Sequence, residues 1–213
     1  MLLITIILLT IFLFNLIIYW VLFIKSKKKE EKVIKLFYKL FPVIWTLSLI
    51  PIPIINLSFL RLYFPSNFSY FGEYWIFFAL LGITFIIIGI IFAKRANRAY
   101  KIKPMNKNNS ILITKGIFNI IRHPIYSAWG IIFLGLAIIS DSLTSLIVSV
   151  LIFIILEINA IIEEKLILIP KFGQKYENYK TKTPNRIIPT PLNLLLIIII
   201  IIIVYVGFLN YNL

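Results

Sequence analysis

The sequence predicts an all-α integral membrane protein with about six transmembrane helices, because its composition is too apolar for a soluble fold. Of its 213 residues, 61% are hydrophobic and 14% are charged, and the mean hydropathy is +0.98. A soluble domain has roughly 45–50% apolar and about 25% charged residues. The chain has one His and no Cys, which excludes disulfides, a thiol nucleophile and a site with several His or Cys ligands, so we expect no metal.

Six apolar segments are the candidate transmembrane helices. A helix needs about 20 mostly apolar residues to cross the bilayer, at about 1.5 Å per residue. The second segment is bent by Pro42, Pro51 and Pro53. The first has no positive charge at its start and no small-residue cleavage site after it, so we expect a retained anchor and not a signal peptide. The six segments are residues 2–24, 41–60, 73–93, 124–139, 143–162 and 192–209.

The 22 Lys and Arg residues support this arrangement and give it an orientation. All except Arg61 fall between the first and second, the third and fourth, or the fifth and sixth segments. Because positive residues remain on the cytoplasmic side, we expect a multi-pass protein of the cell membrane with both termini outside and any active site facing the cytosol. The net charge of +14 is then explained by topology and by contact with anionic membrane lipids, and no nucleic acid partner is expected.

Two long loops divide the chain into three regions. We expect an N-terminal three-helix membrane region at 1–93, a functional core at 94–190 and a C-terminal transmembrane helix at 191–213. Long loops carry function more often than short connections do. The candidate functional residues are therefore sought in the core region.

The first motif precedes the fourth apolar segment. His123 follows Arg122 and stands directly before Pro124, a residue suited to the first turn of a helix. Arg122 and His123 would lie at a helix N-terminus, where free N–H groups and the helix dipole attract an anion. Tyr126 would lie on the same face as His123. The alternative is that Arg122 and Tyr126 only anchor the helix at headgroup depth.

The second motif is the acidic pair Glu163 and Glu164 at the inner end of the fifth segment. Acids at a membrane boundary are costly unless a positive group meets them. Glu157 precedes Glu164 by two helical turns and would project from the same face, and an acid inside a membrane is a functional candidate by default. The alternatives are a solvated helix end neutralised by Lys165, and a Glu157 that only hydrogen-bonds a neighbouring helix.

The third motif is Phe-Gly-x-x-Tyr-x-x-Tyr at 172–179, followed by a proline-rich stretch at 183–189. Tyr176 and Tyr179 would share one helical face, which the prolines then end. The pattern is typical of an amphipathic cap that lies on the bilayer surface.

Together the three motifs resemble the isoprenylcysteine carboxyl methyltransferase family and, more distantly, the phospholipid methyltransferases. The shared pattern adds Gly-x-aromatic at 116–118 and a helical hairpin to the Arg-His-Pro-x-Tyr, Glu-Glu and tyrosine motifs, and it extends over about 110–189. The resemblance implies that the core at 94–190 is a methyltransferase, in which a C-terminal helical hairpin and a cytosolic cap form the cofactor pocket.

The resemblance also implies S-adenosyl-L-methionine as the methyl donor. The chemistry of this donor adds Arg122, which with His123 and the helix N-terminus would hold the donor's carboxylate. It also adds Glu163, which with Glu164 would hold the ammonium group and ribose hydroxyls. The sulfonium suits the aromatic face of Tyr126 or Phe118. Carried over by position, the cofactor-binding residues are Ile111, Leu112, Ile113, Phe118, His123, Pro124, Ile125, Tyr126 and Glu164.

The methyl acceptor is expected to be a lipid or isoprenylcysteine-like molecule that enters from the bilayer. Ala128 stands where many relatives have Gly, and Ala160 stands where eukaryotic prenylcysteine enzymes have an Arg attributed to substrate binding. The missing Arg, with Glu157 deeper in the same cleft, favours an amine or hydroxyl acceptor that Glu157 would deprotonate. Glu157 and Tyr126, the residue that would face the sulfonium, are the candidate catalytic residues.

Two other functions stay open on the sequence. A sterol-reductase-like membrane oxidoreductase would share the hairpin and a terminal tyrosine region, but it would use NADPH. A non-catalytic membrane scaffold or transporter component would use neither cofactor, although a transporter more often shows inverted repeats, which are not evident here.

Overall fold

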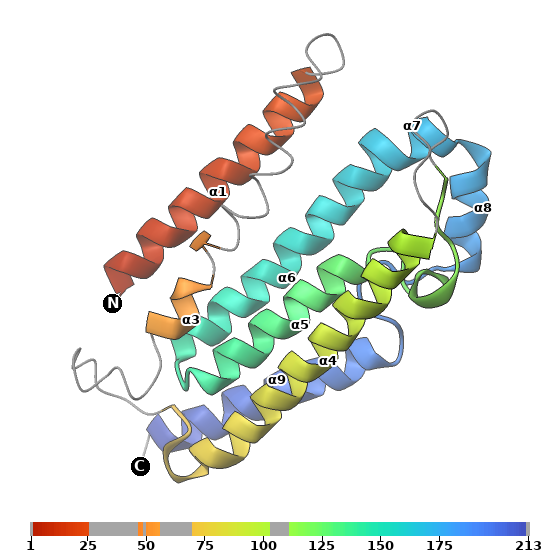
Figure 1. Ribbon diagram of the computed structural model, residues 1–213. Coiled ribbons are helices and arrows are strands. Elements are labelled where there is room, and N and C mark those ends of the chain that lie inside the picture. The colour runs from red at the N-terminus through yellow and green to blue at the C-terminus, as the bar shows by residue number, and fades with distance from the viewer. Residues whose placement is uncertain (1, 26–46, 49, 56–69, 103–110, 212–213) are drawn as a thin grey trace.

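Helices are the only regular secondary structure in the part of the chain that the computed structural model describes, which is residues 2–25, 47–48, 50–55, 70–102 and 111–211 (Figure 1). No strand occurs within these ranges. The elements in chain order are α1 (Leu2–Lys25), α3 (Pro51–Ile55), η2 (Gly72–Tyr74), α4 (Trp75–Ile102), η3 (Gly116–Asn119), α5 (Pro124–Ile139), α6 (Leu143–Glu163), η4 (Glu164–Leu168), α7 (Ile169–Phe172), α8 (Gln174–Lys182) and α9 (Leu192–Tyr211).

Three helical stretches are long and apolar enough to cross a membrane: Gly72–Ala99, Leu143–Phe172 and Leu192–Leu209. Two shorter apolar stretches, Ile6–Val21 and Pro124–Ile139, accompany them. The length and apolar character of these helices support the expectation of a membrane protein. The predicted second segment, 41–60, falls mostly outside the described residues, which include only α3 and a few neighbours there. The number of six spans and their orientation stay predictions.

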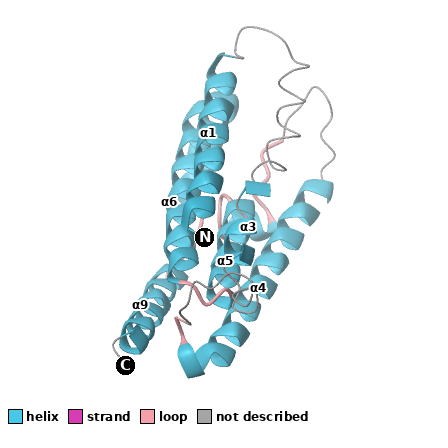
Figure 2. Cartoon of the chain, turned by 90° about the vertical axis from the view of Figure 1, so that its left-hand side faces the viewer, coloured by secondary structure: helices cyan, strands magenta, loops and turns pink. Residues whose placement is uncertain are grey.

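Helices α4, α5 and α6 lie side by side and form the centre of the molecule (Figures 1 and 2). Close approach of α4 to α5 depends on glycine, because a Cβ atom added at Gly82 would lie 2.6 Å from the carbonyl oxygen of Gly135. Gly89 is similarly close to the backbone of Ala128. The Ala128 that stands in place of Gly is itself buried at this contact.

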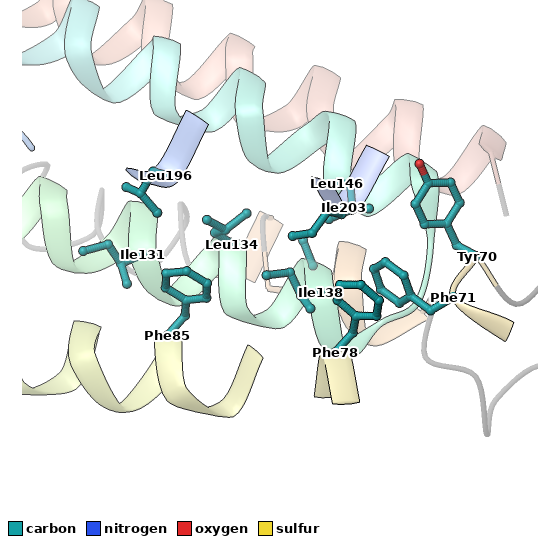
Figure 3. Close-up of a cluster of buried hydrophobic side chains, with 11 residues drawn as sticks. Tyr70, Phe71, Phe78, Phe85, Ile131, Leu134, Ile138, Leu146, Leu196 and Ile203 are labelled. Atoms are coloured by element: carbon teal, nitrogen blue, oxygen red, sulfur yellow. The ribbon is translucent and has the colours of Figure 1, made fainter. Parts of the chain in front are cut away.

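Aromatic and branched side chains from four helices fill the core at one end of these helices (Figure 3). Phe71 stacks on Phe78 with ring centroids 4.0 Å apart, and α9 contributes Leu196 and Ile203. The turn between α5 and α6 closes the same end, where the buried carboxylate of Asp141 accepts the backbone N–H of Phe71 at 2.7 Å. This end is therefore held by packing and by buried polar contacts such as that of Asp141.

Two helices are longer than the sequence predicted. Helix α4 continues to Ile102, so the expected boundary at 93/94 falls inside a helix, and Lys94, Arg95 and Arg98 lie on that helix and not in a loop. Residues 94–102 are rich in Ala, Lys and Arg, which are strong helix formers. The helix expected to end at 162 continues through a π-helical turn to Phe172. Residues 166–169 are apolar and half-buried, so they continue the helix without a polar break.

Candidate functional site

The site lies at the N-terminus of α5, which the proline-rich stretch covers. Pro124 begins the helix and His123 is its N-cap residue. The backbone N–H of Arg122 donates to the carbonyl of Asn185 at 3.0 Å, and that of His123 donates to the carbonyl of Arg186 at 2.9 Å. These two N–H groups are therefore not free to hold an anion, because they already bond to the returning chain.

Arg122 is also directed into the protein. Its Nε donates to Oε1 of Glu164 at 2.8 Å, and its Nη1 donates to the carbonyls of Thr183 and Pro184 at 2.6 and 2.7 Å. The side chains of Arg122 and Glu164 are only 3% and 4% exposed. Arg122 thus has protein partners where the sequence suggested the carboxylate of a donor. Its guanidinium joins the end of α6 to residues 183–184 of the cap, the name used here for α8 with the stretch 183–189.

Glu164 is the centre of a buried network. It is the first residue of the π-helical turn η4, and besides Arg122 it meets Nε2 of His123 at 3.1 Å and Nε of Arg186 at 3.3 Å. All of these contacts end on Oε1. His123 and Glu164 are thus in direct contact, whereas a ligand pocket shared by the two stays a prediction. The alternative of a solvated helix end does not hold for Glu164, which is buried.

Tyr126, Glu163 and Asn159 form a second, more accessible edge of the site. The hydroxyl of Tyr126 donates to Oε2 of Glu163 at 2.8 Å and accepts from Nδ2 of Asn159 at 2.9 Å. The ring of Tyr126 lies parallel to that of His123, with centroids 5.5 Å apart and an interplanar angle of 4°. The Glu163 side chain is 30% exposed, in contrast to Glu164. Sequence reasoning missed Asn159, although it is the only amide side chain in the fifth apolar segment.

Arg186 is the other functional candidate that the site prediction missed. It forms an ion pair with Glu157 and reaches Glu164 from the cap. Burial alone would lower the pKa of its guanidinium, but the hydrogen bond to Glu157 and the charge of Glu164 raise that pKa above its usual value. The expectation that this cleft lacks an arginine is therefore wrong. Position 160 on α6 is an alanine, and the guanidinium comes from Arg186, 26 residues further along the chain.

The tyrosines of α8 close the site from the cap side. Tyr176 and Tyr179 are both buried and their rings meet edge to face, so the predicted shared face is confirmed. The hydroxyl of Tyr179 donates to the carbonyl of Phe118 at 2.6 Å. The hydroxyl of Tyr176 has no hydrogen-bond partner within the described residues. Burial, and the nearby Glu164 carboxylate, raise the pKa of that hydroxyl.

The remaining predicted cofactor residues lie along one flank of the site. Phe118 and Pro124 are buried, Ile113 and Ile125 pack against the buried cluster around Phe118, and Leu112 is half-buried. Ile111 is exposed. These side chains give an apolar border to the polar network but make no polar contact with it among the interactions described here.

A groove of about 560 Å³ opens on the other flank, between α6, the stretch after Thr183 and the start of α9. Glu157 and Arg186 line it, together with apolar side chains such as Phe153 and Ile154. The groove therefore places one ion pair beside a lipid-like lining.

Residues 77–175 match the model of the phospholipid methyltransferase family. The match begins within α4 and ends at the start of α8, so it contains the hairpin and Arg122, His123 and Glu164. No curated protein and no solved structure matches the chain significantly. The match supports the more distant of the two families that the sequence resembles, and with the apolar helices it supports a membrane methyltransferase that acts on lipids. It does not support the isoprenylcysteine carboxyl methyltransferase family specifically.

Proposed function

We propose that this protein is an integral membrane methyltransferase that takes its methyl group from S-adenosyl-L-methionine and transfers it to an amine of a lipid headgroup at the cytosolic face. The observation that carries the proposal is the edge formed by Glu163, Tyr126 and Asn159 beside His123. It combines an accessible carboxylate, a stacked pair of aromatic rings and a buried amide in one place.

This edge fits a cationic donor. A sulfonium is attracted to aromatic faces and to a nearby carboxylate, which Tyr126 and Glu163 offer together. Two buried atoms, Oδ1 of Asn159 and the hydroxyl oxygen of Tyr176, have no hydrogen-bond partner among the described residues. Buried polar atoms without partners are costly, so an acceptor and a donor are ready for a bound ligand with N–H and hydroxyl groups. Arg122 and Glu164 would support the edge from behind, since each is paired and buried.

The acceptor would occupy the groove lined by Glu157 and Arg186. Its apolar walls suit an acyl chain, and its ion pair lies at the end nearest Glu164. Glu157 is 40% exposed and Arg186 26% exposed, so both can be reached by a headgroup. Three carboxylates, those of Glu157, Glu163 and Glu164, stand against the two guanidiniums of Arg122 and Arg186. The remaining negative charge favours an ammonium over a carboxylate as the acceptor.

The chemistry needs little from the protein beyond alignment. When bound, S-adenosyl-L-methionine would supply an electrophilic methyl group to the acceptor nitrogen and would leave as the neutral thioether S-adenosylhomocysteine. The nitrogen would first lose a proton, and Glu157 would accept it once its ion pair with Arg186 opens. Water is excluded by the cap, whose buried tyrosines and paired arginine cover the site. Tyr126 would hold the methyl donor in the reactive orientation.

Donor binding can be tested by calorimetry on the detergent-solubilised chain. S-adenosylhomocysteine should bind, and Glu163→Gln should weaken it about tenfold or more, as expected for a lost charge-assisted contact. Glu177→Gln is the matched control, because Glu177 is exposed and, among the described residues, forms an ion pair with Lys180 alone. Binding of NADPH in place of S-adenosylhomocysteine would contradict this proposal and favour a membrane oxidoreductase. Binding of neither compound would favour a non-catalytic scaffold.

The acceptor can be tested with a donor labelled in its methyl group. Lipids with amine headgroups should be labelled in preference to hydroxyl-headed lipids and to a farnesylated cysteine analogue. Glu157→Gln should slow labelling while leaving the affinity for S-adenosylhomocysteine unchanged. Efficient methyl ester formation on the farnesylated analogue, unaffected by that substitution, would show the proposed acceptor to be wrong.

A further inference from the structure

A polar pocket lies between η3 and α8, beside the buried residues Tyr179 and Thr183. It has a volume of about 500 Å³ and opens between the turn that carries η3 and the exposed face of α8. Three lysines line it, Lys115, Lys175 and Lys182, with the amides of Asn119 and Asn178 between them. We call it the lysine pocket. The phospholipid methyltransferase match and the proposed reaction leave these lysines without a role.

The lysines converge from two separate elements. Lys175 and Lys182 are two turns apart on α8, with Asn178 between them on the same face. Lys115 precedes η3 on the opposite wall. In the described part of the chain no acidic side chain forms an ion pair with any of the three, whereas Lys180 on the same helix pairs with Glu177 at 3.2 Å. Three like charges around one cavity repel each other unless an anion joins them.

The pocket has a fixed shape because hydrogen bonds hold its two walls together. The Tyr179 hydroxyl bonds the carbonyl of Phe118 at 2.6 Å, and Oγ1 of Thr183 bonds the carbonyl of Asn119 at 3.3 Å. Gly116 begins the turn at a φ of +68°, and nothing lies within 4 Å of where its Cβ would be. The backbone of the turn therefore borders open space inside the pocket.

We propose that the lysine pocket binds a phosphate-bearing anion. A phosphate group carries one to two negative charges and several acceptor oxygens, which match three ammonium groups and two amide donors better than a single carboxylate does. The pocket lies at the same end of the molecule as Lys94, Arg95 and Arg98 of α4, the end that the charge pattern assigns to the cytoplasmic leaflet. An anionic phospholipid headgroup and a soluble phosphate are the two possible sources of this one chemistry.

A bound phosphate would add a bridge between η3 and α8. In η3, Phe118 packs against Ile125 of α5, and in α8 the hydroxyl of Tyr176 lies near the Glu164 carboxylate. The anion would thus hold the cap closed over the N-terminus of α5. This inference does not rest on the proposed reaction, since binding to the pocket is measured without any methyl donor.

The test is the thermal unfolding midpoint of the detergent-solubilised chain, titrated with three probes. These are a short-chain phosphatidylglycerol, a short-chain phosphatidylcholine and inorganic phosphate. We expect phosphatidylglycerol or inorganic phosphate to raise the midpoint, and the active probe identifies whether the source is lipid or soluble. The double variant Lys175→Gln with Lys182→Gln should lower the affinity for that probe about tenfold or more, because two charge-assisted contacts are lost. Lys180→Gln, outside the pocket lining, should leave it unchanged.

Three outcomes would overturn the proposal. The first is no shift with either anionic probe. The second is an equal shift with phosphatidylcholine, which carries no net charge. The third is a loss of probe affinity in Lys180→Gln as large as in the double variant, because the binding would then depend on total charge and not on the pocket. All three lysines are on the surface side of the pocket, so the variants should fold. Their unfolding midpoints without any probe, and a Lys175→Arg variant that keeps the charge, check this point.

Discussion

Nε of Arg122 lies 2.8 Å from Oε1 of Glu164, and the same guanidinium donates to the backbone carbonyls of Thr183 and Pro184. One side chain therefore joins the start of α5, the C-terminal end of α6 and the stretch that follows α8. The three segments are far apart in the sequence, and the contact is almost completely buried. Whatever ligand the site holds, its walls depend on this contact.

Removing Arg122 should be strongly destabilising. In Arg122→Ala the buried Glu164 keeps fewer positive partners and two carbonyls lose their donor, a change that typically costs about 3–5 kcal/mol. The measurement is the free energy of unfolding in detergent. Lys180→Ala is the control, because it removes an exposed pair worth about 0–1 kcal/mol. Equal effects of the two substitutions would mean that the buried contact is not formed.

The hydroxyl of Tyr126 should matter for ligand binding more than for folding. Tyr126→Phe keeps the ring that stacks on His123 but removes the bridge from Asn159 to Glu163. We expect the affinity for S-adenosylhomocysteine to fall about tenfold or more, the scale of a lost hydrogen bond to a charged group. Tyr74→Phe, at an exposed residue of η2, should have no effect. Unchanged affinity in Tyr126→Phe would remove this residue from the donor site.

Tyr176 should make the protein sensitive to alkaline pH. Its pKa is raised in the folded state, so the unfolded chain loses this proton first as the pH rises. The stability from this group is fully present below the unfolded pKa of about 10 and is lost as the pH rises above it. The free energy of unfolding should therefore fall more steeply between about pH 9 and 11 in the wild-type chain than in Tyr176→Phe. Tyr205→Phe, at an exposed residue of α9, should retain the wild-type slope.

The orientation can be tested with single introduced cysteines, because the chain has none of its own. A thiol at position 175 on α8 should react with a membrane-impermeant reagent only from the cytosolic side. A thiol at position 74, at the opposite end of α4, should react only from outside. Labelling of position 175 from the outside would contradict the predicted topology.

The hairpin could be predicted from the sequence because its signals are local. The apolar segments at 124–139 and 143–162 agree with α5 and α6, and Pro124 marks the start of α5 as expected. The shared face of Tyr176 and Tyr179 is equally local, since it follows from helical spacing alone. The placement of His123 beside Glu164 needed the resemblance as well, because 41 residues separate the two.

The partners of the arginines could not be predicted from local pattern. Arg122 was expected to face a ligand, and it faces Glu164 because the cap folds back over the N-terminus of α5. Arg186 lies in the cap, so only the tertiary fold brings it to Glu157. The end of α4 was misplaced for a different reason. A run of basic residues looks like a loop at a membrane surface, yet these side chains are good helix formers that can extend toward water.

The π-helical turn at Glu164–Leu168 makes chain length, and not only composition, critical at this site. A π turn contains one residue more than the α-helical turn that it replaces, so the residues after it are rotated by about 100° relative to an unbroken α-helix. Substitutions in this segment keep that phase. A single deletion there would restore a regular helix and turn α7, with the cap that follows it, to a new direction. Glu164 would keep its place on α6, but the cap would no longer bring Thr183, Pro184 and Arg186 to it.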